Sequence, residues 1–210
     1  MAVSPRIGLL GGSFDPVHRA HIALARAAYG HLQLDRVVLI PAGQPWQRRP
    51  LAASPEHRLR MLELTCQDDA GLTINTTELT RSGPTYTIDT LERLDRGAHY
   101  IWILGTDQLE NFCSWHRWRD ILDHVQLAVA QRPGSACTPT PELQAALEEN
   151  QQVLLPIPFE PMPISATGIR QRLATGQAVN DMLDARVLDY IHTHHLYSGD
   201  GRAARSTHSL

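Results

Sequence analysis

Two glycines followed by two histidines form the most chemically suggestive segment of the chain, at residues 11–21. Gly11 and Gly12 directly follow an apolar run, and without side chains they let the backbone approach a ligand closely. The residues after them enter a segment of helical periodicity, whose first turn offers unpaired N–H groups and a positive dipole end that suit phosphate. His18 and His21 are three positions apart and fall on one face of that turn. Their imidazoles are therefore suited to stabilising charge on a transferring phosphoryl group.

Two other interpretations of the histidine pair remain open. A structural zinc site would need a third ligand, and the sequence offers no cysteine or cluster of histidines nearby. Two unrelated surface histidines are the second alternative. The preceding glycines favour phosphate chemistry over both.

A second candidate phosphate-binding segment, Ile164–Arg170, lies nearer the C-terminus. Ser165 is a favourable helix N-cap, Thr167 adds a hydroxyl, and Arg170 projects from the first turn of the expected helix. Taken alone, the segment is better interpreted as a plain capped helix with a solvent-facing arginine, because such caps are common. Together with the glycine and histidine segment, it predicts a second contact with a polyphosphate.

All 19 basic residues of the chain are arginines, and the absence of lysine excludes several classes of enzyme. A P-loop of the Walker A type, a Schiff-base or pyridoxal enzyme and a nucleotidyl-lysine intermediate all require a lysine. Phosphates must therefore be met by arginine, histidine, hydroxyls or backbone amides. The net charge of −3, without a long run of one sign, argues against a nucleic-acid-binding surface.

The cysteines and the apolar segments indicate the cellular compartment. Cys66, Cys113 and Cys137 fit neither a disulfide framework nor a CxxC metal pattern, so we expect semi-buried, unpaired side chains. A charged leader with a following apolar segment is not recognisable, and apolar stretches stay short of a membrane span. We therefore expect a cytoplasmic protein that is neither exported nor embedded in a membrane.

Short apolar runs alternate with longer amphipathic segments, which is typical of an α/β fold with a doubly wound parallel sheet. The strands are predicted at Ile7–Leu10, Val37–Ile40, Ile101–Leu104, Leu127–Ala130 and Val153–Ile157. The helices between them are predicted at His18–His31, Pro55–Thr65, Ile88–Arg93, Trp118–His124 and Glu142–Glu149. Ligands of such folds bind at the carboxyl ends of the strands, so we expect the chemistry in the loops that follow them.

Two final helical segments, Ala166–Ala174 and Asp184–His194, are predicted to form a C-terminal helical cap. A length of 210 residues, with 42% hydrophobic and 20% charged residues, suits one globular unit. We therefore expect residues 1–197 to form a single domain and residues 198–210, which are small and polar, to form a disordered tail. The oligomeric state is left open.

The two phosphate-binding segments together resemble the HxGH nucleotidyltransferase superfamily. Within it, three further segments resemble the bacterial nicotinate-nucleotide adenylyltransferases: Tyr86–Leu91, Leu104–Asp107 followed by Trp115, and Tyr190-Ile191 with Leu196-Tyr197. The resemblance extends over nearly the whole chain, and it implies a Rossmann-like nucleotidyltransferase fold.

For the activity, the resemblance implies transfer of AMP from ATP to nicotinate mononucleotide. The products would be nicotinate adenine dinucleotide and pyrophosphate, in the biosynthesis of NAD. No covalent enzyme intermediate and no protein-bound metal are expected, and Mg²⁺ would accompany ATP. The resemblance assigns catalysis to His18, His21 and Arg170. It assigns ATP binding to Gly11, Gly12, Ser13, Phe14, His18, His21, Arg132, Ser165, Thr167 and Arg170.

The same resemblance places four residues around the acceptor. Thr87 and the pair Trp115-His116 would surround the pyridine ring, and Asp107 would lie near the sugars. Stacking of an aromatic side chain on the ring, with amide donors facing the carboxylate, would favour nicotinate over nicotinamide. A core or lid aromatic is the alternative interpretation of Trp115.

Two departures from the family pattern stand out. The HxGH motif has glycine at its third place, where this chain has Ala20, and the added methyl would crowd whatever packs on that face of the helix. The segment Gln44–Pro50 lacks the usual His-Lys or His-Arg dipeptide. Two rival functions therefore remain: nucleotidyl transfer to another acceptor, such as phosphopantetheine or nicotinamide mononucleotide, and a non-catalytic nucleotide-binding regulator.

Overall fold

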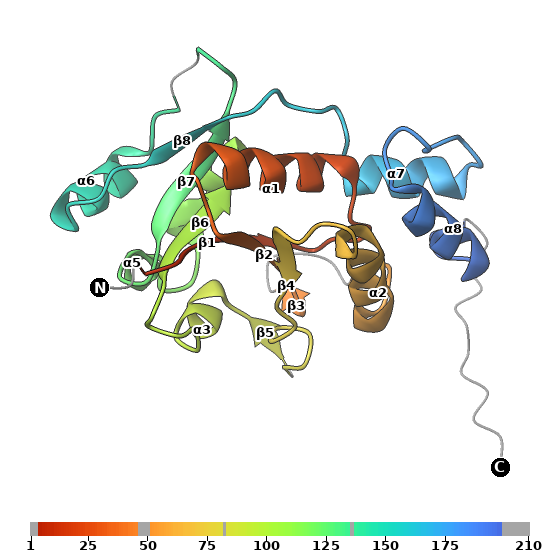
Figure 1. Ribbon diagram of the computed structural model, residues 1–210, viewed down its shortest axis with the longest axis horizontal. Coiled ribbons are helices and arrows are strands. Elements are labelled where there is room, and N and C mark those ends of the chain that lie inside the picture. Colours follow the sequence, from red (N-terminus) through yellow and green to blue (C-terminus); the bar gives the residue numbers. More distant parts are fainter. Residues whose placement is uncertain (1–3, 46–50, 82, 135–136, 199–210) are drawn as a thin grey trace.

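The computed structural model describes residues 4–45, 51–81, 83–134 and 137–198, and its centre is a six-stranded parallel sheet (Figure 1). The strands lie in the order β4-β2-β1-β6-β7-β8, and every neighbouring pair is parallel. Their bounds are β1 Arg6–Gly12, β2 Arg36–Pro41, β4 Leu72–Ile74, β6 His99–Leu104, β7 Gln126–Gln131 and β8 Leu155–Pro158. The chain first winds outward from β1 to β4 and then returns to β6 on the other side of β1. This reversal confirms the predicted doubly wound topology, and its switch point lies between β1 and β6.

The remaining elements surround this sheet. Two short parallel strands, β3 (Gln44–Pro45) and β5 (Pro84–Thr85), form a separate pair. The helices are α1 Arg19–His31, α2 Pro55–Cys66, α3 Thr87–Leu91, α4 Thr106–Glu110, α5 Trp118–Leu122, α6 Pro141–Glu149, α7 Ala166–Ala174 and α8 Ala185–Thr193, with a 3₁₀ turn, η1, at Phe112–Ser114. No helix among the described residues is long and apolar enough to cross a membrane.

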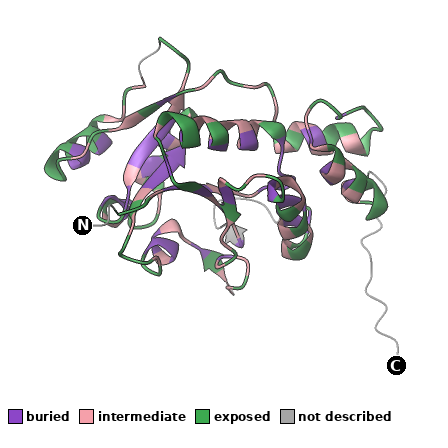
Figure 2. Ribbon diagram, in the orientation of Figure 1, coloured by how far each residue is buried: buried purple, intermediate pink, exposed green. Residues whose placement is uncertain are grey.

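Each face of the sheet has its own hydrophobic core because strand side chains alternate between faces. Leu10 of β1 packs with buried residues of α1, α2, α7 and α8, whereas Ile7 and Leu9 pack with those of α3 to α6. Figure 2 shows the buried residues concentrated on the strands and on the inward sides of the helices. The two layers of helices thus hold the carboxyl ends of β1 and β6 in a fixed relation.

Most predicted elements are found close to their expected bounds, and the exceptions are short. The strand predicted from Val153 begins only at Leu155, because the Val153 side chain is 66% exposed. The strand β4, the pair β3 and β5, and the helix α4 were not predicted. These elements have five residues or fewer, too few for a hydrophobic period to show.

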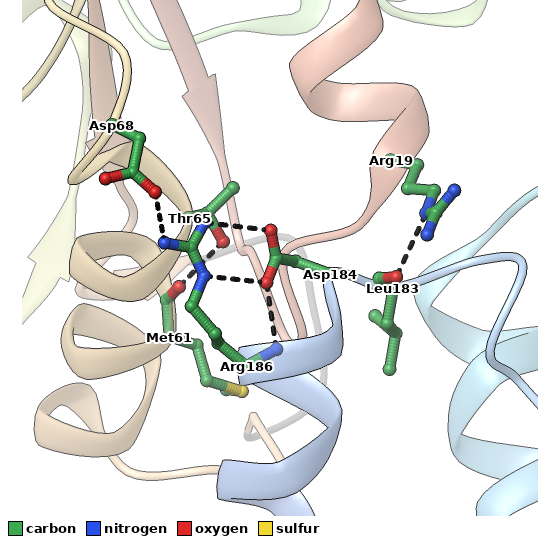
Figure 3. A network of polar contacts seen from close by, with 7 residues as sticks. All are labelled: Arg19, Met61, Thr65, Asp68, Leu183, Asp184 and Arg186. Atoms are coloured by element: carbon green, nitrogen blue, oxygen red, sulfur yellow. Dashed lines mark hydrogen bonds and ion pairs between the residues drawn. The ribbon is translucent and has the colours of Figure 1, made fainter.

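The predicted C-terminal helical cap is attached to the start of α1 and the end of α2 (Figure 3). The Arg19 backbone N–H donates to the Met182 carbonyl at 2.9 Å, and its Nε donates to the Leu183 carbonyl at 3.0 Å. Asp184 caps α8 and pairs with Arg186, which also reaches Asp68 after α2. The backbone contact matters most, because it fixes the residue that follows His18. Of the predicted tail, residues 199–210 lie outside the described part of the chain.

A buried arginine on α2 joins the loops that follow β1 and β2. The Arg58 side chain is almost fully buried, at 1% exposure, and it donates to the carbonyl oxygens of Ser13 at 2.8 Å and Gly43 at 3.5 Å. Gly43 itself has no room for a side chain, since a Cβ there would lie 2.1 Å from the Glu78 carbonyl oxygen. Arg58 thereby connects the loop after β1 to the loop after β2 through hydrogen bonds to both.

Replacing Arg58 with methionine should lower the free energy of unfolding by about 3 kcal/mol, because buried carbonyls lose their donor and the Asp15 carboxylate loses a nearby cation. Arg60→Met is the matched control on the same helix. The Arg60 side chain is 54% exposed and pairs with Glu63, so its loss should cost no more than about 0.5 kcal/mol. Urea denaturation of both variants measures the difference, and equal losses would contradict the role given to Arg58.

Candidate active site

A cavity of about 380 Å³ opens at the switch point of the sheet, where ligands of doubly wound folds bind. Its walls come from the residues after β1, the end of β2, the starts of α3 and α4, and the segment around η1. The lining residues are Gly11, Gly12, Ser13, Ile40, Ala42, Glu78, Thr85, Tyr86, Thr87, Trp102, Asp107, Gln108, Asn111, Ser114, Trp115 and His116. The structure thus brings one segment of the phosphate-binding loop into the same cavity as residues from the middle of the chain.

All four residues expected around the acceptor line this cavity: Thr87, Asp107, Trp115 and His116. Trp115 is half-buried and packs against the Phe112 ring, with centroids 5.3 Å apart, so it belongs to the core and to the cavity wall at once. His116 is exposed and lies against the Tyr86 ring, with centroids 4.4 Å apart and planes tilted by 37°. A flat ring entering the cavity would find aromatic surfaces from two separate segments.

One wall residue, Glu78, carries no signal in the sequence that could have identified it. The side chain is buried and accepts a hydrogen bond from the Thr90 hydroxyl at 2.9 Å, which connects the cavity wall to α3. Burial raises the pKa of Glu78. Because its neighbours lie in other segments of the chain, only the folded structure brings it to the cavity.

The two glycines at the end of β1 are required by packing as well as by ligand approach. A Cβ on Gly11 would lie 2.8 Å from the Trp102 ring, and one on Gly12 would lie 3.1 Å from the Phe14 ring. Phe14 itself is fully buried and has a positive φ of 46°, a conformation that side chains rarely adopt. The backbone from Gly11 to Phe14 is therefore closely packed, and its first three residues line the cavity.

His18 and His21 lie with their rings stacked, 3.6 Å apart between centroids and 21° from parallel. His18 is the N-cap of α1 rather than its first residue, and its backbone N–H donates to Nδ1 of His21 at 3.3 Å. An accepting Nδ1 carries no proton, so this contact assigns the His21 ring proton to Nε2. Burial lowers the pKa of His18 to about 4, which leaves its imidazole neutral at pH 7.

The C-terminal segment lies against the histidine loop. The Ser165 hydroxyl accepts from the Gly168 N–H at 3.1 Å and caps α7, as predicted. Arg170 donates to the Asp15 carbonyl oxygen at 2.7 Å and to the Thr167 hydroxyl at 3.2 Å. Arg170 is therefore not the solvent-facing arginine of the simpler interpretation. The two candidate phosphate-binding segments are in direct contact.

Two other residues singled out in the sequence lie at the edges of this arrangement. Arg132 directly follows β7, is exposed, and is not among the residues that line the cavity. Ala20 is the second residue of α1 and is half-buried. The segment Trp46–Pro50, whose composition departs from the family pattern, lies outside the described residues. Within the described part of the chain, no group of three or more His, Cys, Asp or Glu side chains is arranged to hold a metal ion.

Comparisons with known proteins agree on one family. Residues 9–172 match the model of the family described as cytidylyltransferase-like. A probable nicotinate-nucleotide adenylyltransferase from Bordetella petrii is 56% identical, over 91% of this chain and 98% of that protein. One from Laribacter hongkongensis is 43% identical, over 97% of this chain and the whole of that protein.

Solved structures show the same fold at low sequence identity. The nicotinic acid mononucleotide adenylyltransferase of Plasmodium falciparum complexed with NaAD matches with a TM-score of 0.71 and 19% identity, over 92% of this chain and 97% of that one. The same protein complexed with APC matches with a TM-score of 0.69 and 20% identity, over the same shares of the two chains.

The buried position of His18 predicts a specific pH dependence of stability. A histidine in the unfolded chain has a pKa of about 6.5, whereas the pKa of His18 in the folded protein is about 4. Between pH 6.5 and pH 4, protons therefore bind His18 more readily in the unfolded chain than in the folded one. The stability is complete above pH 6.5, and it should fall by about 2 kcal/mol by pH 5 on account of this one residue. His18→Gln should remove that part of the fall.

Urea denaturation at pH 7, 6 and 5 tests the expectation, with His31→Gln as control. His31 is exposed at the other end of α1, so this control should keep the wild-type slope. Identical slopes in wild type and His18→Gln would show that burial does not keep His18 neutral.

Proposed function

We propose a reaction for this chain on the basis of its family. The chain belongs to the cytidylyltransferase-like family and, within it, to the nicotinate-nucleotide adenylyltransferases. The reaction is transfer of AMP from ATP to nicotinate mononucleotide, with nicotinate adenine dinucleotide and pyrophosphate as products. It is a step in the biosynthesis of NAD.

The end of β1 and the loop that follows it support the proposal, because this segment lines the cavity at its start and holds the stacked histidines at its end. Gly11, Gly12 and Ser13 form part of the cavity wall, and the same loop ends at His18. Arg170 contacts the loop between these ends. A pyridine nucleotide in the cavity and a triphosphate along α1 and α7 would thus meet at this loop.

The proposed chemistry is a direct in-line displacement. An oxygen of the nicotinate mononucleotide phosphate attacks the α-phosphorus of ATP, and the bond from that phosphorus to the bridging oxygen breaks to release pyrophosphate. The acceptor phosphate is already ionised at neutral pH, so no general base is needed. The protein acts by positioning the two phosphates and by stabilising the charge on their oxygens.

Each side chain has a distinct part in this proposal. His18, which is neutral, and His21 donate hydrogen bonds to the transferring phosphate, His21 through Nε2–H. The fixed positive charge comes from Arg170, which contacts the β- and γ-phosphates together with the Ser165 and Thr167 hydroxyls.

The rest of the ATP site consists of backbone and one further arginine. The backbone of Gly12, Ser13 and Phe14 approaches the nucleotide closely, and Arg132 lies near it. Mg²⁺ arrives bound to ATP, as part of the substrate.

The acceptor side of the proposal uses the cavity wall. Trp115 stacks on the pyridine ring, Thr87 and His116 lie around it, and Asp107 contacts the sugar. The aromatic surfaces of Trp115 and of the Tyr86–His116 pair support this assignment.

Two wider features belong to the same proposal. Residues 1–197 act as one nucleotidyltransferase domain, which the shared central sheet supports. The reaction takes place in the cytoplasm, in keeping with three cysteines that are all unpaired thiols.

Pyrophosphate release tests the acceptor. The purified protein receives ATP and Mg²⁺ with nicotinate mononucleotide, nicotinamide mononucleotide or phosphopantetheine in separate reactions. We expect strong release with nicotinate mononucleotide alone. Release with another acceptor would replace the proposed substrate, and no release with any of them would indicate a nucleotide-binding protein without this activity.

His18→Ala tests the catalytic contact. Loss of one hydrogen-bond donor to the transferring phosphate should lower kcat by about 100-fold or more. His31→Ala at the opposite end of α1 should leave kcat within about twofold, since substitutions away from a functional site have small effects. Steady-state kinetics with a melting curve for each variant separate catalysis from folding, and an unchanged kcat in His18→Ala would refute its role.

A further inference from the structure

Asp15 has the most heavily bonded side chain in the loop between the glycines and His18. The side chain is 2% exposed, and its two oxygens accept three hydrogen bonds. The Ala52 N–H donates to Oδ2 at 2.7 Å, while the Ala53 N–H at 3.1 Å and the Tyr197 hydroxyl at 2.7 Å donate to Oδ1. Segments from before α2 and after α8 therefore converge on one buried carboxylate.

The backbone of the same residue holds the second phosphate-binding segment. The Asp15 carbonyl oxygen accepts the hydrogen bond from Arg170. Phe14 and Val17 on either side have exposed fractions of 1% or less, so the loop is packed into the protein interior up to His18. The orientation of the Asp15 peptide consequently sets where Arg170 lies relative to the histidines.

Tyr197 reaches Asp15 through an unusual backbone. Its φ is +61°, and His195 two residues earlier has φ +51°. A left-handed residue is common just after a helix, which accounts for His195, whereas Tyr197 lies beyond that position. Strained backbone of this kind persists where its surroundings require it, and here it brings the Tyr197 hydroxyl to the carboxylate.

Burial keeps the Tyr197 hydroxyl a hydrogen-bond donor. Burial and, after it, the nearby Asp15 carboxylate raise the pKa of Tyr197. Its hydroxyl thus remains protonated at neutral pH. The cation of Arg58 lies close enough to Asp15 to interact with it, and Arg58 also holds the Ser13 carbonyl.

We propose that Tyr197 and Asp15 are positioning residues for the nucleotide: the Tyr197 hydroxyl orients the Asp15 carboxylate, and Asp15 in turn holds Arg170 at the spacing from His18 that a triphosphate requires. The proposal rests on the proposed function for its substrate. Neither residue touches the reacting atoms. Their effect should therefore appear in the handling of ATP rather than of the acceptor.

Tyr197→Phe tests this with the smallest possible change, because only the hydroxyl is lost. Tyr190→Phe is the matched control, since the Tyr190 hydroxyl bonds to Nδ1 of His57 at 2.9 Å and does not contact Asp15. Tyr197→Phe should lower kcat/KM for MgATP by about tenfold, with KM for the acceptor within about twofold, as expected for loss of a hydrogen bond to a charged group. Tyr190→Phe should change neither kcat/KM for MgATP nor KM for the acceptor.

A double-mutant cycle tests whether Tyr197 acts through Asp15. Asp15→Ala removes both acceptor oxygens, and the variant carrying both changes should lose no more kcat/KM than Asp15→Ala alone. Additive losses would overturn the proposal, as would a Tyr197→Phe variant that melts earlier yet has wild-type kcat/KM below its Tm. If Asp15→Ala fails to fold, the comparison of Tyr197→Phe with Tyr190→Phe decides alone.

Calorimetric titration with MgATP in the absence of acceptor separates this inference from the proposed function. Weaker ATP binding by Tyr197→Phe than by Tyr190→Phe supports the positioning role even if nicotinate mononucleotide proves not to be the acceptor. Equal ATP affinity in the two variants, together with equal kcat/KM, refutes it.

Discussion

Buried backbone polar groups must find partners, and this constraint on the loop after β1 determines where several distant segments lie. The Ser13 carbonyl is met by Arg58 of α2, and the Asp15 carbonyl is met by Arg170 of α7. The Gly12 carbonyl accepts from the Ala42 N–H after β2 at 2.8 Å. Each of these donors comes from a different element. The loop thus acts as the point around which α2, α7 and the end of β2 are arranged.

The chemistry of the site follows from a division between charged and neutral groups. In a chain without lysine, the positive charge near the phosphates falls to arginine, whose planar guanidinium suits paired oxygens. The histidines contribute in another way. His18 is neutral because it is buried, and its ring stacks on that of His21. Arginine for charge and histidine for directed hydrogen bonds are a coherent pair of roles for phosphoryl transfer.

The sequence is sufficient for the parts of the fold that have a periodic pattern and for the residues that belong to recognisable segments. The strands β1, β2, β6 and β7 follow from apolar runs, and the four predicted acceptor residues do lie in one cavity. Contacts between distant residues could not be predicted. No local pattern pairs Arg58 with Ser13, and no spacing indicates that Tyr197 meets Asp15 across 182 positions. The neutral state of His18 could not be predicted from the sequence either. It depends on burial by other elements, and the hydrophobic pattern does not show where those elements lie relative to His18.

The contact between Tyr197 and Asp15 also bears on how the protein matures during translation. Domains generally fold as units, and α7 and α8 share one hydrophobic core with α1 and α2. Synthesis runs from the N-terminus, so Tyr197 is among the last described residues to be made. The final partner of the Asp15 carboxylate therefore joins only when the C-terminal segment is complete. A chain that ended before residue 197 would contain every strand of the central sheet and still lack this hydrogen bond.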